Sequence, residues 1–284
     1  MKARWSLIML LPFAFSFALL TATQFVFVER SLYSDLGMGR MGDTFTLANY
    51  YRFFSDSFYL ENLLLTIKLS LLAVVFTLIL GFPISYIIAR MRSRWAMVLL
   101  AGIVVTGFVT IVIKVYGIVI MFAANGLLNR FLVGVGLIDE PYSILGNQTG
   151  VVIGLMYFSL GFAILLLYGV IQTIPRSLEE AAQIHGASRL GVHLQIVIPL
   201  SLPGVTVATL MMFNLCMGAF TSAALLGAGR VLTLPVLIQR TIIVDTKYAM
   251  GGTLAFVLLV SVMLINILSV LLLKRWRFAR HVAA

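Results

Sequence analysis

Two adjacent acids stand out in a long polar connection of the sequence. Glu179 and Glu180 are followed directly by the small residues Ala181 and Ala182, and Ser177 precedes Glu180 by three positions. The spacing S-x-x-E fits a capping box, in which the two side chains satisfy backbone N–H groups at the start of a helix. Acids in the first turn also interact favourably with the helix dipole. We therefore expect a short helix that begins at this box.

The same connection continues with signals for a turn and a second helix. Gly186 permits the left-handed conformation that ends many helices, and residues 189–197 can form another short helix before Pro199. Such a helix–glycine–helix element suits docking against another protein. An ordinary amphipathic segment at the membrane surface is the alternative interpretation.

Other residue types that commonly do chemistry are sparse. The three histidines are His185, His193 and His281, and none has an acidic partner at metal-ligand spacing. The single cysteine, Cys216, has apolar neighbours and fits a buried thiol. The sequence therefore predicts neither a metal site nor a catalytic group.

Four polar side chains lie within otherwise apolar stretches. Lys68 and Lys114 can extend their ammonium groups to a membrane surface, or they can stand at the outer mouth of a solute pathway and meet an anionic group. Asn214 is expected near the midplane of its span, where it can join two helices or line the pathway. Ser159 and Gly161 share that depth in another span and fit either close helix packing or a pathway wall.

The elements that position these residues follow from the composition. Of 284 residues, 61% are hydrophobic and 11% are charged, and the mean hydropathy is +1.08. Soluble domains average about a quarter charged residues. The composition therefore excludes a soluble enzyme, a nucleic-acid-binding domain and a disordered chain. A net charge of +10 fits the basic cytoplasmic loops of a polytopic membrane protein.

Six stretches are long and apolar enough to cross a bilayer as helices, which need about 20 residues each. A helix also pairs its own backbone groups, as lipid requires. The first stretch is too long for a signal peptide, so we expect it to be retained. The expected fold is an all-α membrane protein, with one permease-like domain over 1–284 and a long inner connection over 174–202. The predicted spans are Trp5–Val28, Leu60–Ala89, Ala96–Ala123, Thr149–Thr173, Pro203–Leu226 and Gly252–Leu273.

Charge predicts the orientation. With both termini in the cytoplasm, the inner loops and ends hold eleven Lys and Arg residues against two Glu, a net charge of +9. The outer loops hold seven against eight acids, a net charge of −1. This asymmetry follows the positive-inside rule, and Trp5, Trp95 and Trp276 then fall at the inner boundary, where tryptophan is enriched.

The sequence contains no evident energy source for transport. The predicted spans hold no Asp or Glu away from their ends, although proton-coupled transporters commonly use such residues. The nucleotide-binding pattern G-x-x-x-x-G-K-[ST] is also missing. If the protein transports a solute, a partner must drive it.

The polar connection over 174–202 resembles a known motif, the EAA motif of ABC importer permeases. The family usually ends the motif with Leu-Pro, where this chain has Ile-Pro. The motif is specific because of its length and its place in a cytoplasmic loop. The matching residues are Glu180, Ala181, Ala182, Gly186, Ile196, Ile198 and Pro199.

Nearly the whole chain resembles the spermidine/putrescine-type branch of this family. The similar segments are 45–50, 66–70, 81–86 and 126–129. One departure lies in the third predicted span, where the branch often has Arg-Thr-Tyr and this chain has Lys-Val-Tyr over 114–116.

The resemblance implies a type I importer in the bacterial inner membrane. Two permeases would form the pathway, two cytoplasmic ATPase subunits would bind ATP and Mg, and an extracytoplasmic binding protein would deliver the solute. This chain would hold no cofactor and would not be an enzyme. The connection would be the coupling element that fits the ATPase, with contributions from Glu179, Glu180, Ala181, Ala182, Gly186, Ile196 and Pro199. Apart from the resemblance, Lys114, Asn214 and Ser159 are the candidates for the pathway.

Several alternatives remain open. A membrane scaffold or sensor subunit could dock a cytosolic partner through the same connection, and a secondary transporter is disfavoured by the missing acids. For the solute, the resemblance favours a polyamine. The spans, however, hold two lysines and lack acids away from their ends, which suits an anionic or zwitterionic solute such as an opine, a phosphonate or an amino-acid-like compound.

Overall fold

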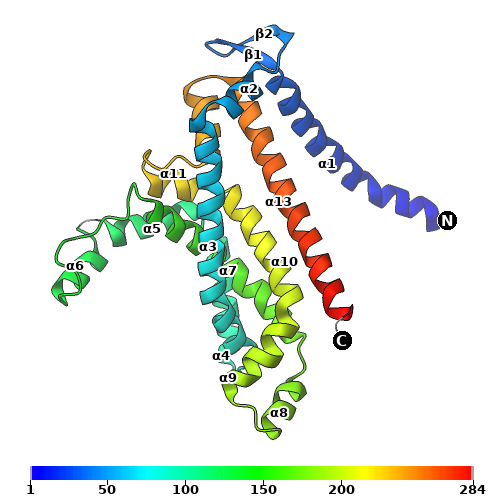
Figure 1. Ribbon diagram of the computed structural model, residues 1–284, viewed down its shortest axis with the longest axis vertical. Helices are drawn as coiled ribbons and strands as arrows, with labels where there is room; N and C mark the ends of the chain where they lie inside the picture. Colours follow the sequence, from blue (N-terminus) through cyan, green and yellow to red (C-terminus); the bar gives the residue numbers. More distant parts are fainter. Residues whose placement is uncertain (1, 124, 283–284) are drawn as a thin grey trace. The chain divides into compact units, whose positions relative to one another are not determined.

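A computed structural model describes residues 2–123 and 125–282, and most of them are helical (Figure 1). Six segments are long and apolar enough to cross a membrane, which confirms the expected all-α membrane protein with six such helices. They are Leu10–Ser31, Ser57–Arg90, Ile111–Gly134, Gln148–Gln172, Arg189–Met217 and Tyr248–Leu271.

The elements follow one another in a simple order, with two π-helical turns over His193–Val197 and Arg240–Val244. They are α1 (Lys2–Ser31), β1 (Tyr33–Gly37), β2 (Arg40–Phe45), α2 (Ala48–Ser55), α3 (Ser57–Arg90), α4 (Trp95–Phe108), α5 (Ile111–Phe122), α6 (Leu127–Gly134), α7 (Gln148–Gln172), α8 (Arg176–Ile184), α9 (Arg189–Val192), α10 (Ile198–Met217), α11 (Thr221–Gly227), α12 (Leu234–Gln239) and α13 (Tyr248–Val282).

The chain divides into two compact units. One comprises Met1–Leu63 with Leu234–Ala284, and the other comprises Leu64–Thr233. That the whole chain acts as one permease domain stays a prediction.

The first unit is held together where α13 begins. Phe53 of α2 is fully buried among Leu234 and Leu237 of α12 and Leu254 of α13. The carboxylate of Asp35 in β1 accepts hydrogen bonds from the backbone N–H groups of Ala249 and Met250, at 3.0 and 2.8 Å. It thereby satisfies two donors that the first turn of a helix leaves unpaired.

The β1–β2 hairpin is an element that the sequence analysis did not predict. Its two turn residues, Met38 and Gly39, have φ of 47° and 76°, the combination that a tight hairpin turn needs. Gly37, Gly39 and Gly42 also match the spacing G-x-G-x-x-G. They lie in a hairpin and not between a strand and a helix, so they do not form a dinucleotide-binding turn.

In the second unit, α7 packs against α4, α5, α10 and α11. Small residues allow the close approach of these helices. A side chain at Gly154 would overlap Leu226 of α11, and one at Gly204 of α10 would overlap Val170 of α7. Small residues serve the same purpose between helices in membranes generally.

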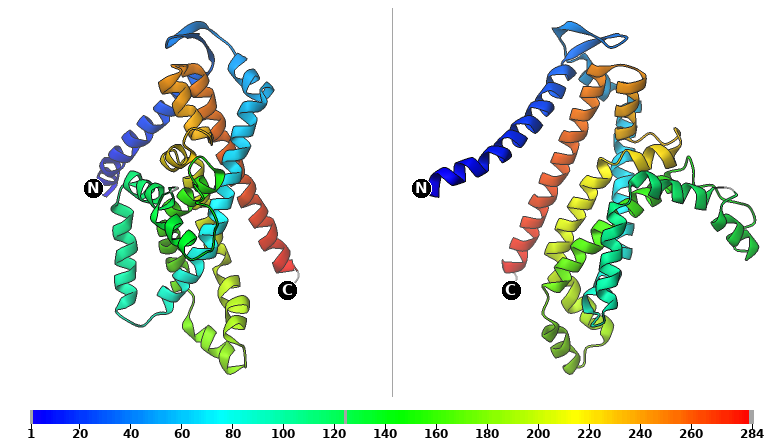
Figure 2. Two further views of the ribbon diagram at one scale, coloured as in Figure 1. Left: turned by 90° about the vertical axis from the view of Figure 1, so that its left-hand side faces the viewer. Right: turned by 180° about the vertical axis from the view of Figure 1, so that it is seen from behind.

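The predicted third span, Ala96–Ala123, is wrong in its bounds. The chain is extended at Val109 and Thr110, so that α4 and α5 are separate helices that run in different directions (Figure 2). The residues from Val109 to Ile113 are all β-branched, which weakens helix preference. Because they are also mostly apolar, hydropathy did not mark the break.

The predicted fifth span, Pro203–Leu226, is also shifted. Helix α10 ends at Met217 before Gly218, and α11 is a separate short helix. The short helix expected over 189–197 should end before Pro199, and this expectation is wrong. The π-helical turn bonds the N–H of Ile198 to the carbonyl of His193 and leads directly into α10. Pro199 then lies in the first turn of α10, where a proline is tolerated.

Candidate functional site

Helix α8 forms where the paired acids predicted a helix, but it begins differently. Its N-cap residue is Pro175, and no side chain caps it. The predicted capping box of Ser177 and Glu180 is therefore wrong. Pro175 occupies the cap position, so Ser177 already lies inside the first turn, and the N–H of Leu178 bonds to the Pro175 carbonyl at 3.2 Å.

The end of α8 confirms the predicted turn at Gly186. This glycine has φ of +85°, and its N–H bonds to the Gln183 carbonyl at 3.0 Å. The N–H of Ala187 bonds to the Ala182 carbonyl at the same distance. The two bonds form the Schellman motif, which satisfies carbonyls at a helix end.

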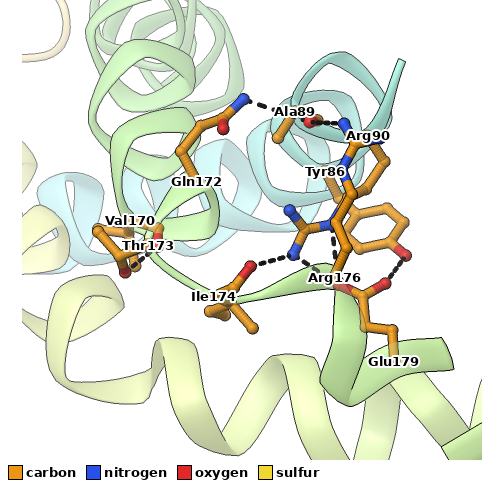
Figure 3. A network of polar contacts seen from close by, with 9 residues as sticks. All are labelled: Tyr86, Ala89, Arg90, Val170, Gln172, Thr173, Ile174, Arg176 and Glu179. Atoms are coloured by element: carbon orange, nitrogen blue, oxygen red, sulfur yellow. Dashed lines mark hydrogen bonds and ion pairs between the residues drawn. The ribbon is translucent and has the colours of Figure 1, made fainter. Parts of the chain in front are cut away.

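The carboxylate of Glu179 is the centre of a buried polar network (Figure 3). The residue is only 7% exposed. Tyr86 donates its hydroxyl to one carboxylate oxygen at 2.7 Å, and Arg90 donates its Nε to the other at 2.8 Å. The Arg90 guanidinium also forms an ion pair with Glu179 at 2.5 Å. Glu179 therefore fastens α8 to the last turn of α3.

Backbone carbonyls extend this network on both sides. Arg90 donates through Nη2 to the carbonyl of Ile174 at 3.1 Å. In return, Arg176 and Gln172 donate to the carbonyl of Ala89, at 3.1 and 3.2 Å (Figure 3). The last carbonyls of a helix have no partner within it, so the end of α3 obtains its hydrogen-bond donors from the connection and from the last residue of α7.

An apolar cluster lies beside the polar network. Ile174, Val192 and Val197 are buried and pack with Phe82 and Tyr86 of α3. The cluster joins the start of the connection, its return through α9 and the end of α3. The base of the 174–202 connection is thus fixed by both apolar and polar contacts.

The other side of the connection is exposed. Glu180, Ala181 and Gly186 are all exposed, and Ile184 and Leu190 expose 85% and 70% of their surface. This side of the connection therefore presents both polar and apolar side chains that no other described residue covers. Ala182, Ile196 and Pro199 are only partly exposed.

Lys114 lies in the first turn of α5, directly after the break in the predicted third span. It lines a cavity of about 780 Å³ together with Thr106, Tyr157, Gly161 and Leu215. The described residues that line this cavity include no acid. Because α4 and α5 are separate helices, the depth of Lys114 cannot be counted along one straight helix. Its role in a solute pathway stays a prediction.

The remaining pathway candidates differ from one another. Ser159 is fully buried, and its hydroxyl lies 3.0 Å from that of Thr77 in α3. This contact fits the close-packing alternative for Ser159. Asn214 lies on the exposed side of α10, next to Met211, which is 45% exposed. Lys68 donates to Gln148 at 3.4 Å, at the beginning of α7.

Metal ligands do not come together among the side chains that the structure describes, because no three of their His, Cys, Asp or Glu residues could hold one ion. His193 bonds through Nδ1 to the Arg189 carbonyl at 2.7 Å, and its ring lies 4.2 Å from that of Tyr86. Cys216 is a buried free thiol, which confirms the expectation for it.

Sequence reasoning missed the roles of Tyr86 and Arg90. Both lie near the end of a predicted span, where Arg90 is one of the eleven inner basic residues that predict the orientation. Their spacing of four residues places both on one side of α3. Nothing in the spacing indicates that a glutamate almost ninety positions later pairs with them.

The sequence of this chain is similar to those of known transport permeases. Residues 81–278 match the family described as "Binding-protein-dependent transport system inner membrane component". The spermidine/putrescine transport system permease protein PotB of Escherichia coli (strain K12) is 32% identical over 236 residues, 83% of each chain. The sulfoquinovosyl glycerol transport system permease protein SmoH of Agrobacterium fabrum is 32% identical over 196 residues, 68% of this chain and 62% of that one.

Solved structures share the fold. A chain of a bacterial alginate ABC transporter, crystallised with its alginate pentasaccharide-bound periplasmic protein, superposes with a TM-score of 0.78 at 18% identity. The superposition covers 94% of this chain and 93% of that one. A chain of the inward-facing MetNI methionine ABC transporter has a TM-score of 0.60 at 16% identity and covers 76% of this chain and 94% of that one.

The network predicts different effects for the two adjacent glutamates. Glu179→Gln leaves the buried Arg90 without its counter-charge, which costs on the order of 3 kcal/mol for a buried pair. We expect faster hydrogen exchange and easier proteolysis over 174–197 in the purified protein. Glu180→Gln, the matched control, removes the same charge from an exposed position and should leave both unchanged. Equal behaviour of the two variants would contradict the anchoring role of Glu179.

Proposed function

Because this chain belongs to the family of binding-protein-dependent transport system inner membrane components, we propose that it is the transmembrane permease subunit of an ATP-driven importer of polyamines. The observation that carries the proposal is the two-sided geometry of α8. One side is fastened to α3 through Glu179, and the other side is exposed. A coupling element needs both properties, since it must contact a partner and transmit its movement.

The exposed side of α8 is the proposed docking surface for a cytoplasmic ATPase. Glu180, Ala181 and Ala182 would enter a groove of that subunit, and Gly186 would set the direction of the following chain. ATP and Mg would bind to the ATPase and not to this permease. Ile196 and Pro199 lie where the connection passes into α10, so they would carry movement into the membrane.

Two further partners belong to the proposal. A second permease would complete the pathway, and an extracytoplasmic binding protein would deliver the solute. The alginate transporter that shares this fold was crystallised with a periplasmic protein, which supports such an assembly. In the bacterial inner membrane, the charge asymmetry supports cytoplasmic termini and a cytoplasmic α8.

The proposed solute is a polyamine such as spermidine or putrescine. The support is that the PotB relatives belong to spermidine/putrescine transport systems, and that their similarity extends over most of this chain. A specific observation favours a second candidate, an anionic or zwitterionic solute. The cavity beside Lys114 contains a cation, and its described lining holds no acid. Asn214, on the exposed side of α10, is the other candidate for the pathway.

The alternative function is that of a membrane scaffold or sensor subunit that does not transport a solute. It would keep the docking surface of α8 but would need no pathway. Transport by the reconstituted complex therefore separates the two functions. The coupling loop, by which we mean residues 174–202, is the part to alter first.

Two changes in the coupling loop should weaken its contact with the ATPase. Gly186→Val places a β-branched residue at φ +85°, a strain of about 1–2 kcal/mol, and Glu180→Ala removes an exposed docking charge. We expect each variant to reach the membrane, bind the ATPase more weakly and lose solute-stimulated ATP hydrolysis and uptake.

Gly136→Val is the matched control for the loop variants. Gly136 has φ of +72° and, like Gly186, open space around it, but it lies after α6. The strain is therefore similar and the position is outside the coupling loop. If both loop variants dock and transport like the parent protein, α8 is not the coupling element.

The solute can be identified through the binding protein. On the polyamine proposal, spermidine or putrescine should raise the melting temperature of the cognate binding protein, and the same amines should be taken up by the reconstituted complex. An opine, a phosphonate or an amino acid should do neither. Stabilisation by one of these anionic or zwitterionic compounds alone would replace the polyamine by the second candidate.

Lys114 is proposed to tune passage through the membrane. Lys114→Met removes a charge from the cavity wall, and we expect a changed uptake rate at the same amount of assembled complex. Lys247→Met removes the same charge from an exposed position in the other unit and should have no effect. Uptake that is unchanged at all solute concentrations would mean that Lys114 only extends to the membrane surface.

A further inference from the structure

A second hollow lies beside the network at the end of α3. Its volume is about 730 Å³. Its lining comes from the last turn of α3, the turn that follows, and the chain from α8 to the π-helical turn. The residues that matter are Tyr86, Arg90, Arg92, Gln183, Arg189 and His193.

The charge in this hollow is positive and only partly balanced. Glu179 neutralises Arg90, and both of its oxygens already accept hydrogen bonds. Within the described part of the chain, the guanidinium groups of Arg92 and Arg189 have no ion pair. Two guanidinium groups without a protein counter-charge therefore line this hollow.

The hollow also has a firm wall. The ring of His193 lies against that of Tyr86, with the centroids 4.2 Å apart, and its Nδ1 bonds to the Arg189 carbonyl at 2.7 Å. These contacts fix the backbone that carries Arg189. Both arginines are exposed, and Arg92 lies in the turn before α4. The backbone of Arg189 is thus fixed at one side of the hollow, and both guanidinium groups are accessible to a ligand.

An apolar surface begins next to the hollow. Trp95, only three residues after Arg92, is 67% exposed, and Met97 is 76% exposed. Tryptophan is enriched where the hydrocarbon core meets the headgroups. A basic pocket at this level on the cytoplasmic side is the arrangement that binds phospholipid headgroups.

We propose that this hollow binds the phosphoryl group of an anionic ligand, and that Arg92 and Arg189 donate hydrogen bonds to it. Guanidinium groups bind phosphate oxygens through paired hydrogen bonds. The phosphoryl group can come from an anionic phospholipid of the inner leaflet or from free phosphate. The inference rests on the proposed function only for the cytoplasmic orientation of the hollow.

Lipid binding to the purified complex of both permeases tests the proposal. Native mass spectrometry would follow the retention of dioctanoyl phosphatidylglycerol, with dioctanoyl phosphatidylcholine as the neutral comparison. We expect preference for phosphatidylglycerol, and a loss of about fivefold in affinity for each of Arg92→Gln and Arg189→Gln. Arg94→Gln, two residues from Arg92 but outside the hollow, is the matched control and should bind like the parent protein.

Competition identifies the source of the phosphoryl group. Displacement of phosphatidylglycerol by millimolar inorganic phosphate would support a site for free phosphate, and its retention would support a lipid site. Equal binding by all variants, or equal binding of the neutral lipid, would overturn the proposal. Displacement by the ATPase would also overturn it, because the arginines would then belong to the ATPase docking surface.

The lipid measurement is independent of the proposed transport function. ATPase binding and uptake are measured separately on the same variants. A complex that binds phosphatidylglycerol through the two arginines but fails to bind an ATPase would contradict the importer and leave the hollow assigned. A complex that transports but shows no selective retention would contradict only the hollow.

Discussion

The carboxylate of Glu179 must be satisfied if the coupling loop is to stay attached to the membrane helices. Removing a carboxylate from water costs several kcal/mol, which only close charges and hydrogen bonds offset. Tyr86 and Arg90 meet this requirement because they lie one turn apart on the same side of α3. Nη2 of the Arg90 guanidinium also donates to the Ile174 carbonyl, so the start of the loop is fixed by the same side chain. In turn, Arg176 of the loop and Gln172 at the end of α7 donate to the Ala89 carbonyl near the end of α3.

This mutual dependence explains why two neighbouring glutamates can differ in role. Successive residues of an α-helix are about 100° apart around its axis. Glu179 therefore points to α3 while Glu180 stays exposed. A partner that pushes on the exposed side moves a helix whose other side is bound to α3 by a charged pair and an apolar cluster. On the proposed function, ATP-driven movement would reach the membrane through α3 as well as through Pro199 and α10.

Features set by local chemistry could be predicted from the sequence, and those set by distant contacts could not. Hydropathy identified six membrane helices, and Gly186 was correctly placed at a left-handed helix end. The helix break at Val109 and Thr110 was not predicted, because an apolar stretch of β-branched residues has the same hydropathy whether the helix continues through it or ends there. The capping box failed because Pro175 competes for the same position. The partner of Glu179 lies 89 residues away, and no local pattern encodes that pairing.

The break after α4 also bears on how a pathway could be built. Lys114, which was expected near the outer end of one continuous helix, lies instead at the start of a separate helix, in a cavity wall shared with α7 and α10. A cation at that wall repels a polyamine, and no acid of the described lining offsets it. If polyamines are the solute, the acids that attract them must come from the second permease or from the binding protein. On this proposal, charge assigns different roles to the subunits. This chain anchors the coupling helix and limits passage, and its partners recognise the cation.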